Sequence, residues 1–366
     1  MPTVADVLRR YGPAYLERFG AAIPREHRKV LDAIIACRTG ELGTVIYQCA
    51  SCGTTHAMGR SCGNRHCPTC QQDKTKAWLE KQIDRLLPCP YFLITFTVPA
   101  GLRDFLRRHQ RVGYAALFEA SSAAIKTLAA DPKYLGAQRC GFFGVLHTWG
   151  RTLEYHPHVH YVVPGGGISA DGSQWLASRA DFFVPVKALS ILFRAKLRHA
   201  LDRAGLLAEV DAAVWRQDCV VNSQAVGDGG TSLKYLAPYV FRVAITNRRI
   251  ISCADGRVTF SYRRSGSNRY RKMTVDASEF IRRFLQHVLP SGFSKARHYG
   301  FLCSASRQSV GAVRWLITLY YRLVYRLLPN APQEIVTESH VRCAICGGPM
   351  RVLAFLPRPV ATFDTS

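Results

Sequence analysis

The stretch Arg151-Thr-Leu-Glu-Tyr-His156-Pro-His158-Val-His160-Tyr-Val-Val-Pro164 decides what fold to expect. Its β-branched and aromatic residues are typical of a strand, and its three histidines stand at every second position. Alternate residues of a strand project from one face. The histidines should therefore point one way, and Val159 and Tyr161 the other. A strand with an apolar back and imidazoles in front predicts a metal platform.

The composition points to a polyanionic partner. The 366 residues include 49 Lys and Arg against 25 Asp and Glu, a formal charge of +24. Such an excess predicts nucleic acid as the partner, ahead of an anionic membrane. No apolar run approaches the about 18 residues that span a bilayer, and Asp6 and Arg9 interrupt any export signal. We therefore expect a cytoplasmic, DNA-associated protein without a membrane partner.

Paired cysteines mark the N-terminal part of the chain. Cys49/Cys52 and Cys67/Cys70 form two CxxC pairs at a spacing close to that of zinc ribbons, so we expect them to share one Zn²⁺. Zinc would add about 10–16 kcal/mol of folding free energy to a lobe with a small core. Four further residues could together hold a second zinc, and the alternative is that they bind no metal. They are Cys62, His66, Cys37 and His27.

A third CxxC pair, Cys343/Cys346, has no obvious second pair near it. His340 or Cys303 could complete a zinc site there, and the alternative is a turn without metal.

Hydrophobic periodicity predicts strands interleaved with helices. Helices are expected over 1–45 in two parts, 101–129, 186–206, 276–289 (with Asp276 and Glu279 as a capping box) and 309–328. Strands are expected over 91–98, 142–149, 156–163, 219–224, 249–253, 258–262 and 270–275. The fold class is α+β. The domains expected are 1–87, binding zinc and DNA, 88–275, carrying the histidine strand, and 276–366, a C-terminal helical region.

A metal on the histidine strand would need a third ligand, and its use depends on the reaction it supports. His147 on the preceding strand is the candidate third ligand, and His156 competes with it. A divalent metal there would hold and polarise a scissile phosphate. Tyr235 and Tyr239 are then candidate nucleophiles, and four residues apart on a helix they would share a face. The alternative is that both are core tyrosines of an amphipathic helix.

Basic residues suggest where DNA would lie. Arg60 and Arg65 flank the cysteine pairs, and Arg242 follows the tyrosines. A further basic run is interpreted as a DNA-contact ribbon, where Tyr262 and Tyr270 could stack on unpaired bases. This run comprises Arg248, Arg249, Arg263, Arg264, Arg269, Arg271 and Lys272.

Taken together, these motifs resemble a known family over nearly the whole chain. They are Cys37-Arg-Thr, Ser61-Cys-Gly-Asn-Arg-His-Cys-Pro-Thr-Cys-Gln71, His147-Thr-Trp-Gly, His156-Pro-His-Val-His160, Pro164-Gly-Gly-Gly167, Tyr235-Leu-Ala-Pro-Tyr239 with Arg242-Val-Ala-Ile-Thr-Asn247, and Pro290-Ser-Gly-Phe293. The sequence resembles the rolling-circle insertion-sequence transposases of the HUH endonuclease superfamily, in which a cysteine-rich zinc-binding domain precedes a two-tyrosine nuclease.

The resemblance implies a fold and an activity. A central antiparallel sheet flanked by helices would hold the histidine strand, with His158 and His160 as the pair that binds Mg²⁺ or Mn²⁺. Tyr235 and Tyr239 would make 5′-phosphotyrosine links to single-stranded DNA at the ends of a bacterial transposon, within a nuclease domain over 88–275. The expected function is therefore a metal-dependent single-strand endonuclease and strand transferase.

Pro238 departs from the pattern, because the family usually has a basic residue there. Proline within a helix removes a hydrogen bond and clashes with the carbonyl four residues back. The helix then either kinks between the tyrosines or begins after Tyr235, and whether both tyrosines act stays open. Two alternative functions also stay open: a rolling-circle replication initiator or relaxase, and a non-catalytic zinc-ribbon DNA-binding protein. The oligomeric state and the DNA sequences recognised are not predicted.

Overall fold

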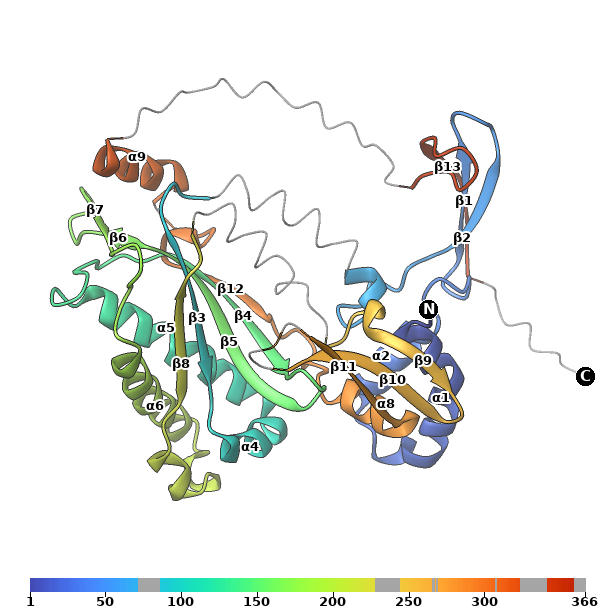
Figure 1. The fold of residues 1–366 in the computed structure, drawn as a ribbon, viewed down its shortest axis with the longest axis horizontal. Coiled ribbons are helices and arrows are strands. Elements are labelled where there is room, and N and C mark those ends of the chain that lie inside the picture. Colours follow the sequence, from blue (N-terminus) through green and yellow to red (C-terminus); the bar gives the residue numbers. More distant parts are fainter. Residues whose placement is uncertain are drawn as a thin grey trace, which may run out of the picture.

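A five-stranded antiparallel sheet forms the centre of the protein (Figure 1). The computed structural model describes residues 1–71, 86–227, 244–264, 267, 269–306, 308–322 and 341–358. The strand order in this sheet is β12-β4-β5-β3-β8, and every neighbouring pair is antiparallel. The strands are β3 (Tyr91–Thr97), β4 (Phe142–Trp149), β5 (Tyr155–Pro164), β8 (Val220–Ala225) and β12 (Ala296–Tyr299).

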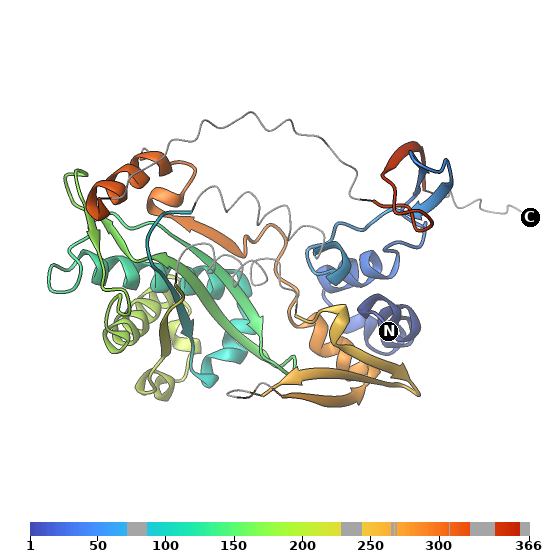
Figure 2. The same cartoon turned by 45° about the horizontal axis from the view of Figure 1, so that its top comes forward.

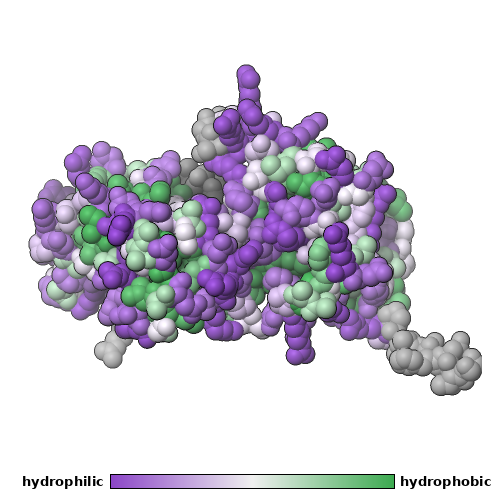
Figure 3. Space-filling view, turned by 90° about the horizontal axis from the view of Figure 1, so that it is seen from below, coloured by the Kyte–Doolittle hydropathy of each residue, from purple (hydrophilic) through white to green (hydrophobic). Residues whose placement is uncertain are grey.

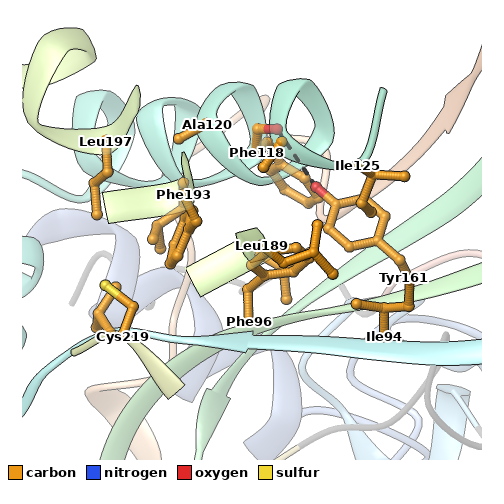
Figure 4. Close-up of a cluster of buried hydrophobic side chains, with 14 of the residues drawn as sticks. Ile94, Phe96, Phe118, Ala120, Ile125, Tyr161, Leu189, Phe193, Leu197 and Cys219 are labelled. Carbon is orange, nitrogen blue, oxygen red and sulfur yellow. Dashed lines mark hydrogen bonds between the residues drawn. The ribbon is translucent and has the colours of Figure 1, made fainter. Parts of the chain in front are cut away.

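Two long helices, α5 (Gln110–Ala130) and α6 (Val186–Arg203), cover one face of this sheet. Figure 4 shows Ile94, Phe96 and Tyr161 rising from the strands toward Phe118, Ile125 and Phe193 of the helices. Tyr161 is fully buried, and its hydroxyl is within 2.8 Å of the Ser121 hydroxyl. These odd-numbered positions of β5 face the helices, so the even-numbered histidines face the other way.

A second group of elements has its own hydrophobic core. In it, three helices pack on a three-stranded sheet of order β11-β10-β9: α1 (Val4–Phe19), α2 (Arg25–Ile35) and α8 (Ala277–Leu285). These strands are β9 (Ile250–Ala254), β10 (Arg257–Arg263) and β11 (Tyr270–Asp276). Phe260 and Phe280 are fully buried between sheet and helix. The N-terminal helices thus share one hydrophobic core with residues some 250 positions later.

A small third sheet has the order β13-β1-β2, with β1 (Thr44–Cys49), β2 (Thr55–Gly59) and β13 (Met350–Leu356). In Figures 1 and 2 it lies apart from the central sheet. The shorter elements are α4 (Arg103–Arg108), α9 (Val310–Tyr321), β6 (Gly166–Ile168) and β7 (Trp175–Ala177). Within the described ranges, no helix combines the length and the apolar character that a membrane crossing requires.

The fold class is confirmed, as are all seven expected strands to within a few residues. The expected C-terminal helical region is corrected, because β12 joins the central sheet and β13 joins the N-terminal hairpin. The capping box at α8 is also corrected. Asp276 makes no side-chain capping bond, and Glu279 instead accepts hydrogen bonds from Arg282 and Arg283, whose positive charge makes them stronger partners.

Candidate metal centres and nucleic-acid interface

Strand register brings three histidines together on the face of the central sheet that points away from α5 and α6. On β4 and β5, His147 lies directly opposite His158, and Thr95 of β3 lies opposite His160. Directly opposed residues share a face. The ring centroids are 4.7 Å apart for His158 and His160, and 4.8 Å apart for His147 and His160. The ligand atoms of all three lie within 4.8 Å of one another, close enough to hold one metal ion.

Both histidines of strand β5 make a hydrogen bond through Nδ1, which leaves Nε2 to face a metal. His160 Nδ1 is 2.9 Å from the Thr95 hydroxyl, and His158 Nδ1 is 2.6 Å from its acceptor, the carbonyl oxygen of His156. A neutral imidazole that donates from Nδ1 presents Nε2 as its ligand atom. Neutral imidazoles in a set of three suit a divalent cation with open coordination positions.

Of the two candidate third ligands, the structure brings His147 into the cluster and leaves His156 out of it. The reason is the register of β4 and β5, which shifts between His147 and Trp149. His147 is buried, and its ring stacks on that of Trp149 with 4.6 Å between the ring centroids. His156 neighbours His158 at 5.2 Å between ring centroids, but its ligand atoms are not among those that lie within 4.8 Å of one another.

The candidate nucleophiles Tyr235 and Tyr239, together with Pro238 and Arg242, lie outside the described residues. Their placement relative to the histidines is therefore part of the proposal below.

The cysteines form two groups of four, and both groups differ from the expected pairing. Cys67 and Cys70 meet Cys37 and Cys62, not Cys49 and Cys52. The Sγ atoms of Cys37 and Cys70 are 3.7 Å apart, and those of Cys62 and Cys70 are 3.6 Å apart. Tetrahedral Zn–S bonds of about 2.3 Å place the sulfurs about 3.8 Å apart. This first group therefore has the donors and the spacing of a structural zinc site.

The first cysteine group joins the end of α2 to the helical turn that begins at Pro68. It sits in the hydrophobic core shared by α1, α2 and the β9–β11 sheet. The predicted site of Cys49, Cys52, Cys67 and Cys70 is wrong because β1 and β2 carry the first pair away from this core. Cys49 and Cys52 instead meet Cys343 and Cys346.

Two histidines expected to complete a zinc site do not reach the cysteines. His66 is partly exposed at its surface, and its Nε2 accepts a hydrogen bond from the backbone N–H of Leu289 at 3.4 Å. Burial lowers the pKa of His66 to about 3, so it stays neutral. His27 lies in α2 beside a groove, away from Cys37. Four cysteines are sufficient for tetrahedral zinc without either histidine.

Most of the predicted DNA-contact residues are exposed. Arg60, Arg248, Arg263, Arg264, Arg269, Arg271 and Lys272 are all on the surface. The last five lie at the end of the β10–β11 hairpin, where Arg263 sits 5.3 Å over the ring of Tyr270. Tyr270 is itself 68% exposed, which leaves its ring accessible for stacking on a base.

Arg65 and Arg249 have other partners. The Arg65 guanidinium donates to the carbonyl oxygens of Leu289, Pro290 and Phe293, so it fastens the cysteine lobe to the segment after α8. Arg249 donates to the carbonyl oxygens of Ser261 and Arg151, each at 2.7 Å. Both guanidinium groups thus link segments within the protein, and their contact with DNA stays a prediction.

These contacts place the basic hairpin beside the histidine strand. Arg151, in the turn before β5, donates to the carbonyl oxygens of Arg263 and Arg264 at 3.1 and 2.6 Å. A separate groove of about 1070 Å³ between α1, α4 and α8 is lined by Arg107, Arg108, Arg111 and Arg282. Figure 3 shows hydrophilic side chains over much of the face seen from below.

Sequence reasoning missed Thr95 and the shared cysteine group. Thr95 carries no motif, and only the β3–β5 register shows its role. The cysteine group did carry a signal, because Cys49-Ala-Ser-Cys52-Gly53 and Cys343-Ala-Ile-Cys346-Gly347 follow the same pattern.

Comparisons with known proteins find relatives of this chain. Residues 7–98 match a family described as "Transposase zinc-binding domain", and residues 141–309 match one described as "Putative transposase". The chain is 40% identical over 328 residues to "Putative transposase y4qJ" of Sinorhizobium fredii, covering 84% of this chain and 82% of that protein. It is 28% identical over 296 residues to the "Transposase for insertion sequence element IS801" of Pseudomonas savastanoi pv. phaseolicola, covering 75% and 70%.

No solved structure matches the chain. The extent and identity of the first relative decide the family, and the two matched segments account for the cysteine lobe and for strands β4 and β5. The chain therefore belongs to the family of insertion-sequence transposases that carry an N-terminal zinc-binding domain.

Proposed function

We propose that this transposase nicks and rejoins single-stranded DNA at the ends of its element, through a tyrosine that becomes bonded to the 5′-phosphate. The observation that carries the proposal is the cluster of His147, His158 and His160 on the central sheet. Three imidazoles whose ligand atoms converge in this way are suited to hold a divalent cation, which metal-dependent DNA cleavage would use.

The histidines fit a divalent cation. His158 and His160 are oriented through Nδ1, so their Nε2 atoms and His147 would hold Mn²⁺ or Mg²⁺. When bound, the ion polarises the scissile phosphate and favours the ionised form of a nearby phenol. Imidazole nitrogen is a softer donor than the oxygens that Mg²⁺ prefers. We therefore expect Mn²⁺ to support more activity than Mg²⁺ at equal concentration.

Tyr235 and Tyr239 are the proposed nucleophiles. The phenolate oxygen of one would attack phosphorus, the bond from phosphorus to the 3′ oxygen would break, and the released 3′ oxygen would take up a proton. The phosphotyrosine bond keeps the energy of the phosphodiester, so a free 3′-hydroxyl can attack it and rejoin the strand without ATP. Two tyrosines would allow cleavage of two strands in turn, and one tyrosine would require sequential use of a single site.

The basic hairpin is the proposed path of the DNA strand. Arg263, Arg271 and Lys272 are exposed there, and Arg151 ties the hairpin to the turn that leads into the histidine strand. Phosphates held on this hairpin would lie close to the metal, and Tyr270 offers a ring for an unpaired base.

The test is an adduct assay on the whole protein. Purified protein is incubated with labelled single-stranded DNA from an element end and Mn²⁺, then denatured and separated by electrophoresis. A labelled band at the mass of protein plus DNA is expected. His158→Ala and His160→Ala should abolish it but retain DNA binding, and His156→Ala is the matched histidine control that should keep it.

The nucleophiles are tested singly. If only Tyr235→Phe or only Tyr239→Phe abolishes the adduct, one tyrosine acts; if each reduces a different step, both act. The proposal fails if the wild-type protein forms no adduct with any strand from the element or its flanks. It also fails if both single variants cleave and rejoin normally.

A further inference from the structure

Two knuckles of the same construction meet in the small third sheet. In the first, the backbone N–H of Cys49 donates to the carbonyl of Thr54, and that of Gly53 donates back to Cys49. In the second, Cys343 donates to Gly348, and Gly347 donates back to Cys343. Gly53 and Gly347 have φ of +73° and +72°, which glycine adopts without strain. Each knuckle therefore presents its two sulfurs in the same way.

The four sulfurs of these knuckles converge. Cys49 Sγ is 3.4 Å from Cys346 Sγ, and Cys52 Sγ is 3.7 Å from Cys343 Sγ. All four lie within 4.8 Å of one another. These separations approach the about 3.8 Å expected around tetrahedral zinc. The backbone N–H groups of Ser51 and Cys52 also point at Cys49 Sγ, at 3.4 and 3.5 Å, and would stabilise a thiolate there.

The knuckles fit each other closely. A Cβ on Gly348 would come within 2.3 Å of Ser51 Oγ and 3.2 Å of Cys49 Sγ, so only glycine allows this approach. The backbone N–H of Ala50 donates to the carbonyl of Pro349 at 2.9 Å, which links the two knuckles directly. Such contacts indicate a built site rather than a chance meeting of thiols.

The sheet that carries these knuckles has little apolar core of its own. Its buried cluster consists of Cys49, Cys343 and Met350, with Tyr47 and Val341 partly buried. Most of β13 is exposed, including Phe355 at 68%. So few buried residues cannot offset the entropy of ordering three strands, and sheets of this size are usually held by metal or disulfides.

We infer that Cys49, Cys52, Cys343 and Cys346 hold a second structural Zn²⁺ that fastens residues 341–358 to the N-terminal hairpin. The ligands come from two segments almost 300 residues apart, and Cys343 and Cys346 lie beyond both family-matched segments. The zinc-binding domain is thus completed by a strand that follows the nuclease part of the chain. This inference does not depend on the proposed cleavage mechanism.

Zinc content of the purified full chain tests the inference, measured by inductively coupled plasma mass spectrometry. Two ions per chain are expected. The double variants Cys49→Ser/Cys52→Ser and Cys343→Ser/Cys346→Ser should each retain one ion. The quadruple variant should also retain one, because both pairs serve the same ion.

Matched controls exclude the other ligand sets. Cys303→Ser should keep both ions, since Cys303 lies outside the cluster. His56→Ala should also keep both, although His56 Nε2 lies 3.4 Å from Cys343 Sγ, because four sulfurs already complete the site. Combining Cys62→Ser/Cys70→Ser with Cys343→Ser/Cys346→Ser should remove both ions, one from each cysteine group.

A measurement on the unaltered protein covers variants that fail to fold. After exchange of zinc for ¹¹³Cd²⁺, two cadmium resonances at shifts typical of four sulfur ligands are expected. The inference is overturned by one zinc ion in the wild-type protein, by two ions in the Cys343→Ser/Cys346→Ser variant, or by two ions lost in the quadruple variant. A Cys49–Cys346 or Cys52–Cys343 disulfide in non-reducing peptide maps would overturn it equally.

Discussion

Thr95→Val is the change that best isolates how the sheet orients the clustered histidines. Thr95 Oγ1 lies 2.9 Å from His160 Nδ1, and strand register places the two residues directly opposite each other. Valine has nearly the same shape and suits a central strand, so the fold should be retained. Only the hydrogen-bond partner of His160 Nδ1 is removed.

The expected loss is one of metal affinity. Removing a hydrogen-bond partner of a metal-bound histidine typically costs 10–100-fold in affinity, or about 1.4–2.7 kcal/mol. The Mn²⁺ concentration that half-activates DNA cleavage should therefore rise by about 10–100-fold, and the rate at saturating Mn²⁺ should largely recover. Isothermal titration calorimetry with Mn²⁺ gives the same affinity without relying on cleavage.

Thr95→Ser is the control, because it keeps the hydroxyl and should bind Mn²⁺ as the wild-type protein does. If Thr95→Val binds Mn²⁺ with wild-type affinity, the tautomer and ligand assignment for His160 is wrong. If Thr95→Ser is as weak as Thr95→Val, packing rather than the hydrogen bond is responsible.

Four other predictions follow from the described contacts. His147→Gln should weaken Mn²⁺ binding at least 10-fold and His156→Gln should not, and equal effects would reject His147 as the third ligand. Arg65→Lys should lower the free energy of unfolding by about 2 kcal/mol in urea titrations, because one ammonium nitrogen cannot replace the two guanidinium nitrogens that reach the three carbonyls. The salt dependence of DNA binding should be unchanged, since lysine keeps the positive charge. Arg263→Ala should reduce the slope of log Kd against log salt by about 1, and an unchanged slope would remove it from the DNA path. Burial lowers the pKa of His287 to about 4 in the folded protein, whereas in the unfolded chain the imidazole takes up a proton near pH 6.5. The free energy of unfolding of the wild-type protein should therefore fall by about 3 kcal/mol between pH 6.5 and 4. His287→Gln does not titrate and should lose that part of the pH dependence.

The local pattern of the sequence was sufficient for the histidine platform. Apolar and polar residues alternate along β5, and alternation in a strand depends only on backbone geometry. Val159 and Tyr161 are buried against the helices, and His158 and His160 face the other side, as predicted. The same reasoning located β3 and β4 to within a residue or two.

The choice between His147 and His156 needed the register of two strands. Register depends on the turn over 150–154, in which Leu153 has a positive φ of 64°. It also depends on the bulge between His147 and Trp149. Neither feature follows from residue types alone, because a shift of one position reverses which side chains share a face.

The cysteine pairing shows the same limit more strongly. CxxC spacing identifies a knuckle, since the two sulfurs of one turn are positioned by a few neighbouring residues. It does not identify the second knuckle, because any pair of knuckles can share a metal. The expected partner pairs lay fifteen residues apart in the chain, whereas the observed partner of Cys49 and Cys52 lies almost 300 residues away.

The sequence by itself determined the family, the charge, the strand that carries the histidines and the presence of metal-binding cysteines. The tertiary structure decided that His147 is the third histidine of the cluster and that Thr95 is the hydrogen-bond partner of His160. It also decided that Arg65 links the cysteine lobe to the segment after α8, and that eight cysteines form two groups of four. The physical reason is the distance along the chain over which each effect acts. Backbone geometry and side-chain periodicity act over a few residues, but ligand sets are assembled by the packing of segments that are distant in the chain.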